Sequence, residues 1–185
     1  MKKRGLFLDR DGVVNVNHGY VHTIDDFQFI DGIFDLTRMA YEKNYVICIV
    51  TNQAGIGRGY YSEEEFNILT DWMCARFRME GSLISKVYYS PYHPIYGIGK
   101  YKKDDCSRKP HPGMLLDAIS EFNIDPTLSI LIGDKVTDIQ AGIAASIGTN
   151  IYLGEADTSK HLSIPHYIRI SNLSEAKSYL MDESR

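Results

Sequence analysis

The sequence predicts an α/β protein in which a parallel sheet lies between two layers of helices. The segment 45–50 is continuously apolar, which is typical of a strand that is buried on both faces, and 6–8 and 128–133 are shorter or mostly apolar runs of the same kind. Segments with apolar residues at helical spacing follow these runs along the chain. Because strands and helices alternate, we expect a three-layer, doubly wound, Rossmann-like sheet.

The expected strands are short apolar segments that end at polar residues or glycines. The segment 87–89 is a weaker candidate than the three runs above. The full set of expected strands is 6–8, 45–50, 87–89, 128–133, 149–153 and 167–170.

The expected helices carry an apolar face and recognisable end signals. Ser62 and Glu65 match a capping box, in which the serine caps the backbone and the glutamate returns the bond. Asn44 can end the first helix, and Pro112 can occupy the first helical position of a later one. The segment 90–109 has no period and is expected to be a functional or mobile loop. The expected helices are 32–43, 62–80, 112–122, 137–145 and 173–180.

Composition indicates one globular domain spanning residues 1–185, with 44% apolar and 24% charged residues. A net charge of −4 gives no electrostatic support for a nucleic-acid partner. The three cysteines are far apart and match neither a disulfide framework nor a zinc pattern. No stretch approaches the roughly 20 apolar residues of a membrane span, so we expect a cytoplasmic protein.

Two aspartates follow the first expected strand. Asp9 and Asp11 are two residues apart, so extended backbone points both side chains toward one volume. Gly12 allows the chain to turn sharply after them. Two carboxylates this close repel each other unless a cation or a shared proton intervenes. Mg²⁺ suits the place, since it takes one or two carboxylates and leaves positions for water and phosphate oxygens.

Two other expected strands also end in polar side chains. Thr51 and Asn52 follow one strand, and Asp134 and Lys135 follow another. Parallel sheets bind ligands beyond the carboxyl ends of their strands. We therefore expect these groups to converge on Asp9, although each alone could be a solvated, capping or strand-end residue.

This set of groups suits the hydrolysis of a phosphate monoester. Asp9 is the expected nucleophile and forms an acyl phosphate. Asp11 protonates the leaving oxygen and then activates the water that hydrolyses the intermediate. Thr51 and Lys109 stabilise the charge on the transferred phosphoryl group. Asp134 is the expected additional metal carboxylate.

Two neighbouring residues have open interpretations. Lys135 bridges the Asp9 carboxylate and the phosphate, or it only anchors its own loop. Asp138 lies one helical turn after Asp134. It holds metal-bound waters, or it caps the helix.

Taken in the order in which they occur along the chain, these residues form four motifs that resemble those of the haloacid dehalogenase superfamily of phosphotransferases. The four motifs are Asp9-Arg10-Asp11-Gly12, Thr51-Asn52-Gln53, Lys109 and Gly133-Asp134-Lys135-x-x-Asp138. Longer matches at 17–21, 51–60 and 108–114 are similar to the heptose bisphosphate phosphatases of this superfamily. The similarity extends over about residues 5–155. It implies the haloacid dehalogenase-type fold, and the short segments between motifs imply a capless member with an open site.

The resemblance implies removal of the C7 phosphate from D-glycero-D-manno-heptose 1,7-bisphosphate, a step of ADP-heptose biosynthesis for lipopolysaccharide. It implies Mg²⁺ held by Asp9, the backbone of Asp11, and Asp134. It also implies that Arg108 contacts the C1 phosphate, for which a guanidinium is well shaped. The residues expected at the substrate are Asn17, His18, Gly19, Tyr20, Asn52, Gln53, Ala54, Arg58, Arg108 and Lys135.

The sequence departs from the family in one loop. Many members carry three cysteines and a histidine there as zinc ligands, and the matching positions here are Ser90, Tyr92, Asp105 and Ser107. His93 and Cys106 remain, but two ligands do not make a structural zinc site. We therefore expect no zinc, and expect tyrosines 92, 96 and 101 to pack the loop unless it is mobile.

Three other functions share part of this set of residues. A histidinol-phosphate or other small-molecule phosphatase of the same superfamily shares most of the motifs. A phospho-receiver domain also groups Asp, Thr and Lys, but places its phosphorylated aspartate on a later strand. An inactive binding domain conflicts with the complete catalytic set. The expected partner is a small phosphorylated sugar, without nucleic acid or membrane, bound by a monomer.

Overall fold

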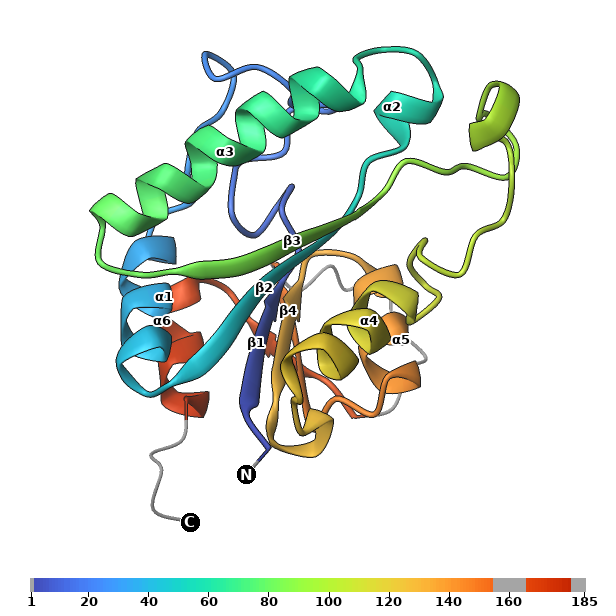
Figure 1. Cartoon of the computed structure of the whole chain (residues 1–185). Helices are drawn as coiled ribbons and strands as arrows, with labels where there is room; N and C mark the ends of the chain where they lie inside the picture. Colours follow the sequence, from blue (N-terminus) through green and yellow to red (C-terminus); the bar gives the residue numbers. More distant parts are fainter. Residues whose placement is uncertain (1, 155–165, 181–185) are drawn as a thin grey trace.

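A computed structural model describes residues 2–154 and 166–180. Its strands are β1 (Arg4–Leu8), β2 (Tyr45–Asn52), β3 (Ile84–Ser90), β4 (Ile130–Gly133), β5 (Thr149–Leu153) and β6 (Ile168–Ile170). They form one parallel sheet in the order β3-β2-β1-β4-β5-β6 (Figure 1). The predicted parallel sheet is confirmed.

The sheet is covered by helices on both faces. The helices are α1 (Ile33–Glu42), α2 (Ala54–Gly57), α3 (Glu63–Met79), α4 (Gly113–Phe122), α5 (Val136–Ala144) and α6 (Leu173–Ala176). Figure 1 shows α1, α3 and α6 on one side and α4 and α5 on the other. The three-layer architecture predicted from the alternation of elements is therefore confirmed.

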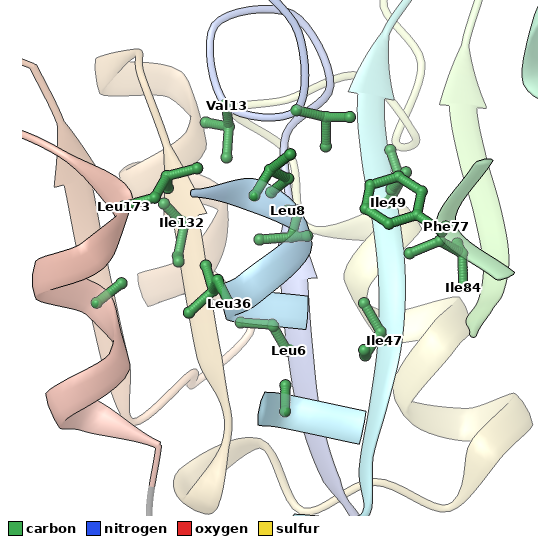
Figure 2. Close-up of a cluster of buried hydrophobic side chains, with 14 of the residues drawn as sticks. Leu6, Leu8, Val13, Leu36, Ile47, Ile49, Phe77, Ile84, Ile132 and Leu173 are labelled. Atoms are coloured by element: carbon green, nitrogen blue, oxygen red, sulfur yellow. The ribbon is translucent and has the colours of Figure 1, made fainter. Parts of the chain in front are cut away.

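The central strand β1 is buried on both faces, which explains its continuous apolar run. Leu6 and Leu8 join the cluster packed under α1, α3 and α6, where Figure 2 shows them near Leu36 and Ile132. Phe7 points the opposite way, into the cluster under α4 and α5. Burial of all three side chains fixes the strand's position and therefore the direction of the residues that follow it.

Several local predictions agree with the structure, and some boundaries differ. Ser62 and Glu65 form the predicted capping box of α3. Pro112 was expected at the first helical position of α4 but lies at its N-cap, because the helix begins at Gly113. The strand expected at 128–133 begins at Ile130, because Leu128 ends a short 3₁₀ helix that follows Asp125. The last predicted helix is α only as far as Ala176 and continues as 3₁₀ turns.

The sheet order places the three strands with polar ends next to one another. Leu8 pairs with Ile49 of β2 on one side and with Ile132 of β4 on the other. The residues that follow β1 and β4, and the last residues of β2, therefore emerge side by side at one sheet edge. Within residues 2–154 and 166–180, no helix combines the length and apolarity needed to cross a membrane.

Candidate active site

Lys109 lies between two buried carboxylates at this sheet edge. Its Nζ is 2.8 Å from Asp9 Oδ1 and 2.6 Å from Asp138 Oδ1. Nζ also donates to the carbonyl oxygen of Val50 at 2.7 Å. Burial would lower the pKa of Lys109, but the carboxylates of Asp138 and Asp9 outweigh burial and raise it. Lys109 is therefore a permanent cation beside Asp9.

The contacts of Asp138 agree with the capping interpretation. Its Oδ2 accepts a hydrogen bond of 2.9 Å from the backbone N–H of Lys135, at the start of α5. Its other oxygen pairs with Lys109. Asp138 thus fixes both the helix end and the lysine.

Asp134 faces Asp9 across the end of the sheet. One oxygen each from Asp9, Asp134 and Asp138 lie within 4.8 Å of one another. Burial, and then the charge of Asp9, raise the pKa of Asp134 from 3.8 to about 7. Its buried Oδ1 accepts no hydrogen bond from the described residues, although Lys135 Nζ lies 3.6 Å away. Two closely spaced carboxylates, one of which has a buried oxygen that accepts no hydrogen bond from the described residues, fit a hard divalent cation such as Mg²⁺.

Gly12 allows Asp134 to approach the loop after β1. Gly12 has a φ of 104°, in the region that favours glycine. A Cβ atom there would lie only 2.1 Å from Asp134 Oδ2. The predicted sharp turn at Gly12 is confirmed, and the glycine is also needed for space.

Asp11 is held by three neighbouring side chains. The Arg10 Nε and Nη2 groups donate to both carboxylate oxygens over 2.9–3.2 Å. Asn15 Nδ2 donates at 3.0 Å and Gln53 Nε2 at 2.9 Å. Arg10 is only 1% exposed and also donates to the Val21 carbonyl. The candidate acid/base group therefore has a fixed position, and the loop after β1 is tied to it.

Two residues expected at the substrate have hydrogen bonds within the protein. Asn52 accepts from the Lys109 backbone N–H and donates to the Lys109 carbonyl, each at 3.0 Å. Gln53 is 2% exposed and donates to both Asp11 and Thr51, while Tyr61 donates to it. Both residues therefore also position catalytic candidates.

Two connected cavities open over the site. The smaller one, called the inner cavity, is lined by Asp9, Asp11, Thr51, Asn52, Lys109, Lys135, Thr137 and Asp138. The larger one, called the outer cavity, has a volume of about 420 Å³. The two share Asp11, Asn52, Lys109, Lys135 and Thr137. The inner cavity has a volume of only about 20 Å³, so the candidate nucleophile lies in a narrow recess that adjoins the outer cavity.

Two arginines line the outer cavity but not the inner one, whereas Lys109 and Lys135 line both. Arg58 and Arg108 both face it, and neither forms an ion pair with a carboxylate among the described residues. Burial, and then the nearby charge of Arg58, lower the pKa of Arg108. Two neighbouring guanidiniums without a carboxylate indicate an anion site.

All residues expected at the substrate line the outer cavity except His18, which is exposed. The motifs did not indicate roles for five further residues near the site, which are Arg10, Asn15, Tyr61, His93 and Thr137. The role of Arg10 could have been inferred from its place next to Asp11 in the sequence, because a buried arginine needs a partner for its charge.

Hydrogen bonds and an ion pair hold together the loop at 90–109, which lacks the zinc ligands of many relatives. Ser107 Oγ lies 3.0 Å from Ser90 Oγ and donates to Asp105 Oδ1 at 2.7 Å. Asp105 also pairs with Lys103 at 2.7 Å, and Lys103 lies over the Tyr92 ring. The predicted packing role of Tyr92 is confirmed, and the absence of zinc stays a prediction.

Comparisons with known proteins agree with this geometry. Residues 106–176 match the HAD-hydrolase-like family model. A Burkholderia mallei protein named D-glycero-alpha-D-manno-heptose-1,7-bisphosphate 7-phosphatase is 52% identical over 160 residues, which are 86% of this chain and 85% of that protein. A Vibrio cholerae protein named as the corresponding beta enzyme is 45% identical, over 91% of this chain and 97% of its own length.

One solved structure is described as D,D-heptose 1.7-bisphosphate phosphatase from B. bronchiseptica, complexed with magnesium and phosphate. It superposes with a TM-score of 0.82 at 23% identity, covering 96% of this chain and 97% of that one. This likeness supports the haloacid dehalogenase-type fold. Sequence identity over most of both chains carries the family assignment: the chain belongs to the D-glycero-D-manno-heptose-1,7-bisphosphate 7-phosphatase family of haloacid dehalogenase-like hydrolases.

Proposed function

We propose that this chain removes the C7 phosphate of D-glycero-D-manno-heptose 1,7-bisphosphate, using Mg²⁺ and an aspartyl-phosphate intermediate. Residues 1–185 act as a single phosphatase domain. The observation that carries the proposal is the pair of joined cavities. One holds Asp9 and Lys109, and the other holds two arginines without a carboxylate partner. The names of the similar Burkholderia and Vibrio proteins support the same substrate.

In the first step, the reactive phosphate lies where the outer cavity adjoins the narrow inner one, against Asp9. A carboxylate oxygen of Asp9 attacks phosphorus, and the bond between phosphorus and the C7 oxygen breaks. Asp11 gives its proton to that oxygen, so that the sugar leaves as an alcohol. Lys109 and Thr51 face the phosphoryl oxygens, where negative charge is spread in the transition state.

In the second step, water attacks the phosphorus of the aspartyl phosphate. Asp11 is now the carboxylate and takes a proton from that water. The bond between phosphorus and the Asp9 oxygen breaks, which releases phosphate and restores the Asp9 carboxylate. The hydrogen bonds from Arg10 and Gln53 fix Asp11 in place for both proton transfers.

The described carboxylates fit a divalent metal ion. Asp9, Asp134 and the backbone carbonyl of Asp11 would hold Mg²⁺. When bound, Mg²⁺ supplies positive charge that screens the nucleophile from the phosphate. Lys135 lies 4.0 Å from Asp9 Oδ2 and lines both cavities, so it contacts the reactive phosphate rather than only its own loop.

The outer cavity binds the second phosphate, at C1. Arg108 donates one Nη1–H to the Tyr92 carbonyl at 3.0 Å, which fixes the guanidinium and leaves other N–H groups free. Arg58 lies over the rings of Tyr20 and Tyr96, which hold it without neutralising it. A substrate with one phosphate leaves both guanidiniums without an anion.

Histidinol phosphate is the alternative substrate within the superfamily. Its second end is an ammonium group, which two arginines would repel. The test is phosphate release from both anomers of the heptose bisphosphate, fructose 1,6-bisphosphate and histidinol phosphate, with and without Mg²⁺. We expect Mg²⁺-dependent turnover with one heptose anomer as the best substrate. Faster turnover of histidinol phosphate would overturn the proposal.

We also propose that the enzyme acts as a cytoplasmic monomer, without zinc and without nucleic-acid or membrane partners. The small phosphorylated substrate and the net charge of −4 support this arrangement. Light scattering and metal analysis of the purified protein test it. A stable dimer, or stoichiometric zinc, would contradict it.

A further inference from the structure

His93 lies in the outer cavity in one defined tautomer. Its Nδ1 is 3.2 Å from the backbone nitrogen of Ile95 and 3.1 Å from that of Tyr96. Both of these groups are N–H donors, so Nδ1 must accept and cannot carry a proton. The ring proton is therefore on Nε2. Among the residues that the structure describes, Nε2 has no hydrogen-bond partner.

The surroundings of His93 also favour the neutral ring. Burial, followed by the charges of Arg108 and Arg58, lowers the pKa of His93. All three side chains line the outer cavity, and none of them lines the inner cavity. At neutral pH these three side chains therefore present two guanidinium cations and one neutral N–H donor to the outer cavity.

Tyr96 orders this group of side chains. Its ring lies 4.8 Å from the His93 ring, centroid to centroid, and the Arg58 guanidinium lies 4.4 Å from its centre. Its backbone N–H is also one of the two donors to His93 Nδ1. His93 and Arg58 are thus held by the same residue, which fixes their relative positions before a ligand binds.

We propose that His93 determines substrate specificity by donating its Nε2–H to the distal phosphate, the one that is not hydrolysed. The inference rests on the proposed function and adds a third donor to the site of Arg58 and Arg108. A phosphate is an acceptor of hydrogen bonds and satisfies all three groups. A neutral donor contributes this bond without the repulsion that a third cation would add beside two guanidiniums.

The same arrangement excludes substrates with a positively charged distal end. An ammonium group carries only donors. It would leave the Nε2–H and both guanidiniums unsatisfied and would be repelled by the two charges. His93 therefore selects an anionic distal group over a cationic one.

The kinetic test compares His93→Leu, which removes the donor, with His93→Gln, whose amide N–H lies near the Nε2 position. His111→Leu is the matched control, because His111 is exposed, contacts Asp104 and lies outside both cavities. The readout is the ratio of kcat/KM for heptose 1,7-bisphosphate to kcat/KM for p-nitrophenyl phosphate, which has no distal phosphate.

We expect His93→Leu to lower this ratio about tenfold, mainly through KM, since a hydrogen bond to a charged group is lost. His93→Gln should recover most of the ratio, and His111→Leu should keep it. An unchanged ratio in His93→Leu would overturn the inference. Equal losses in the Leu and Gln variants would also overturn it, because they would indicate a packing role alone.

A second measurement does not need the His93 variants to fold or the enzyme to turn over. The ring nitrogens of ¹⁵N-histidine-labelled Asp9→Asn protein are recorded with Mg²⁺. We expect His93 to show the neutral Nε2–H tautomer. Heptose 1,7-bisphosphate should shift its Nε2–H signal, whereas heptose 7-phosphate, which lacks the C1 phosphate, should not.

The two proposals can fail separately. If the wild-type enzyme does not hydrolyse the heptose bisphosphate, the proposed function fails, whatever His93 does. If the enzyme hydrolyses it but the bound bisphosphate leaves the Nε2–H signal unchanged, only the role of His93 is overturned. A protonated His93 ring in the free protein would also overturn that role.

Discussion

The Nζ atom of Lys109 lies 2.8 Å from Oδ1 of Asp9, and both residues are 3% exposed. Burial alone would remove the charge from such a lysine. Here Asp138 supplies a second carboxylate at 2.6 Å, and the pKa of Lys109 is raised as a result. The cation beside the proposed nucleophile therefore depends on Asp138, a residue with no proposed role in the chemical steps.

Replacing Lys109 by methionine should affect both activity and stability. The change leaves Asp9 and Asp138 buried without their cation, and breaking a buried pair in this way costs about 3–5 kcal/mol. It also removes a donor to the transition state, for which we expect a loss of about 10²–10³-fold in kcat. Denaturant unfolding and steady-state kinetics measure the two effects.

A double variant separates the two roles of Lys109. Adding Asp138→Asn to Lys109→Met removes one of the two uncompensated charges. We expect the unfolding free energy to recover in part while kcat stays low. Recovery of activity in the double variant would show that Lys109 acts only by neutralising Asp138.

The metal-free protein should become more stable as the pH falls from about 8 to 5. The pKa of Asp134 is about 7 in the folded protein and 3.8 in its ordinary state. Between these values the folded state binds a proton that the unfolded state does not, so protonation stabilises the fold. We expect a gain of about 3 kcal/mol from this group, since pH 5 lies about two units below its pKa and one unit corresponds to about 1.4 kcal/mol.

The Asp134→Asn variant is the control for this pH effect. Its stability should change less over the same range, and its Tm at pH 8 should exceed that of the metal-free wild type. Mg²⁺ should raise the Tm of the wild type most at high pH, because binding needs the deprotonated carboxylate. A wild type and variant with the same pH dependence would rule out Asp134 as the source.

Asp11→Asn should separate the two chemical steps. p-Nitrophenolate leaves without a proton, so the variant should still release a burst of it while Asp9 becomes phosphorylated. The next step needs a base and should be slowed by about 10²–10⁴-fold. An alkyl phosphate should give no burst. Rapid-mixing absorbance measures the release of p-nitrophenolate, and quenched-flow detection of the released alcohol measures the alkyl phosphate. A full-rate steady state with either substrate would contradict the assignment.

Gly12→Ala should weaken Mg²⁺ binding as well as the fold. The new Cβ would lie 2.1 Å from Asp134 Oδ2 and would force the carboxylate to move. Gly99→Ala is the matched control, because Gly99 also has a positive φ but no heavy atom would lie within 4 Å of its Cβ. Calorimetric titration with Mg²⁺ should show a lower affinity only in Gly12→Ala. Equal losses in both variants would mean that backbone strain is the whole effect.

The strands and the polar residues at their ends could be predicted, because at these positions the local sequence pattern agrees with the fold. Asp9 and Asp134 each follow an apolar strand, and Thr51 lies at the end of another. A parallel sheet must bring these ends to one edge. The capping box at Ser62 was predictable for the same reason, since both partners lie within one helical turn.

Contacts between distant segments could not be predicted from the sequence. Gln53 was expected at the substrate, but its amide donates to Asp11, 42 residues away along the chain. Asn52 similarly joins Lys109 across 57 residues. The tautomer of His93 depends on a turn at residues 93–96 whose geometry no motif specifies. Side-chain direction in such loops is set by packing, which leaves no periodic signal.

The most direct test of the account is the identity of the phosphorylated residue during turnover. The enzyme is mixed with heptose 1,7-bisphosphate and Mg²⁺, quenched in acid within the first turnover, digested and examined by mass spectrometry. The account predicts a phosphoryl group on Asp9, and in Asp9→Asn a folded protein with neither the label nor activity. Full phosphate release without a labelled Asp9, or with the label on another residue, would contradict it.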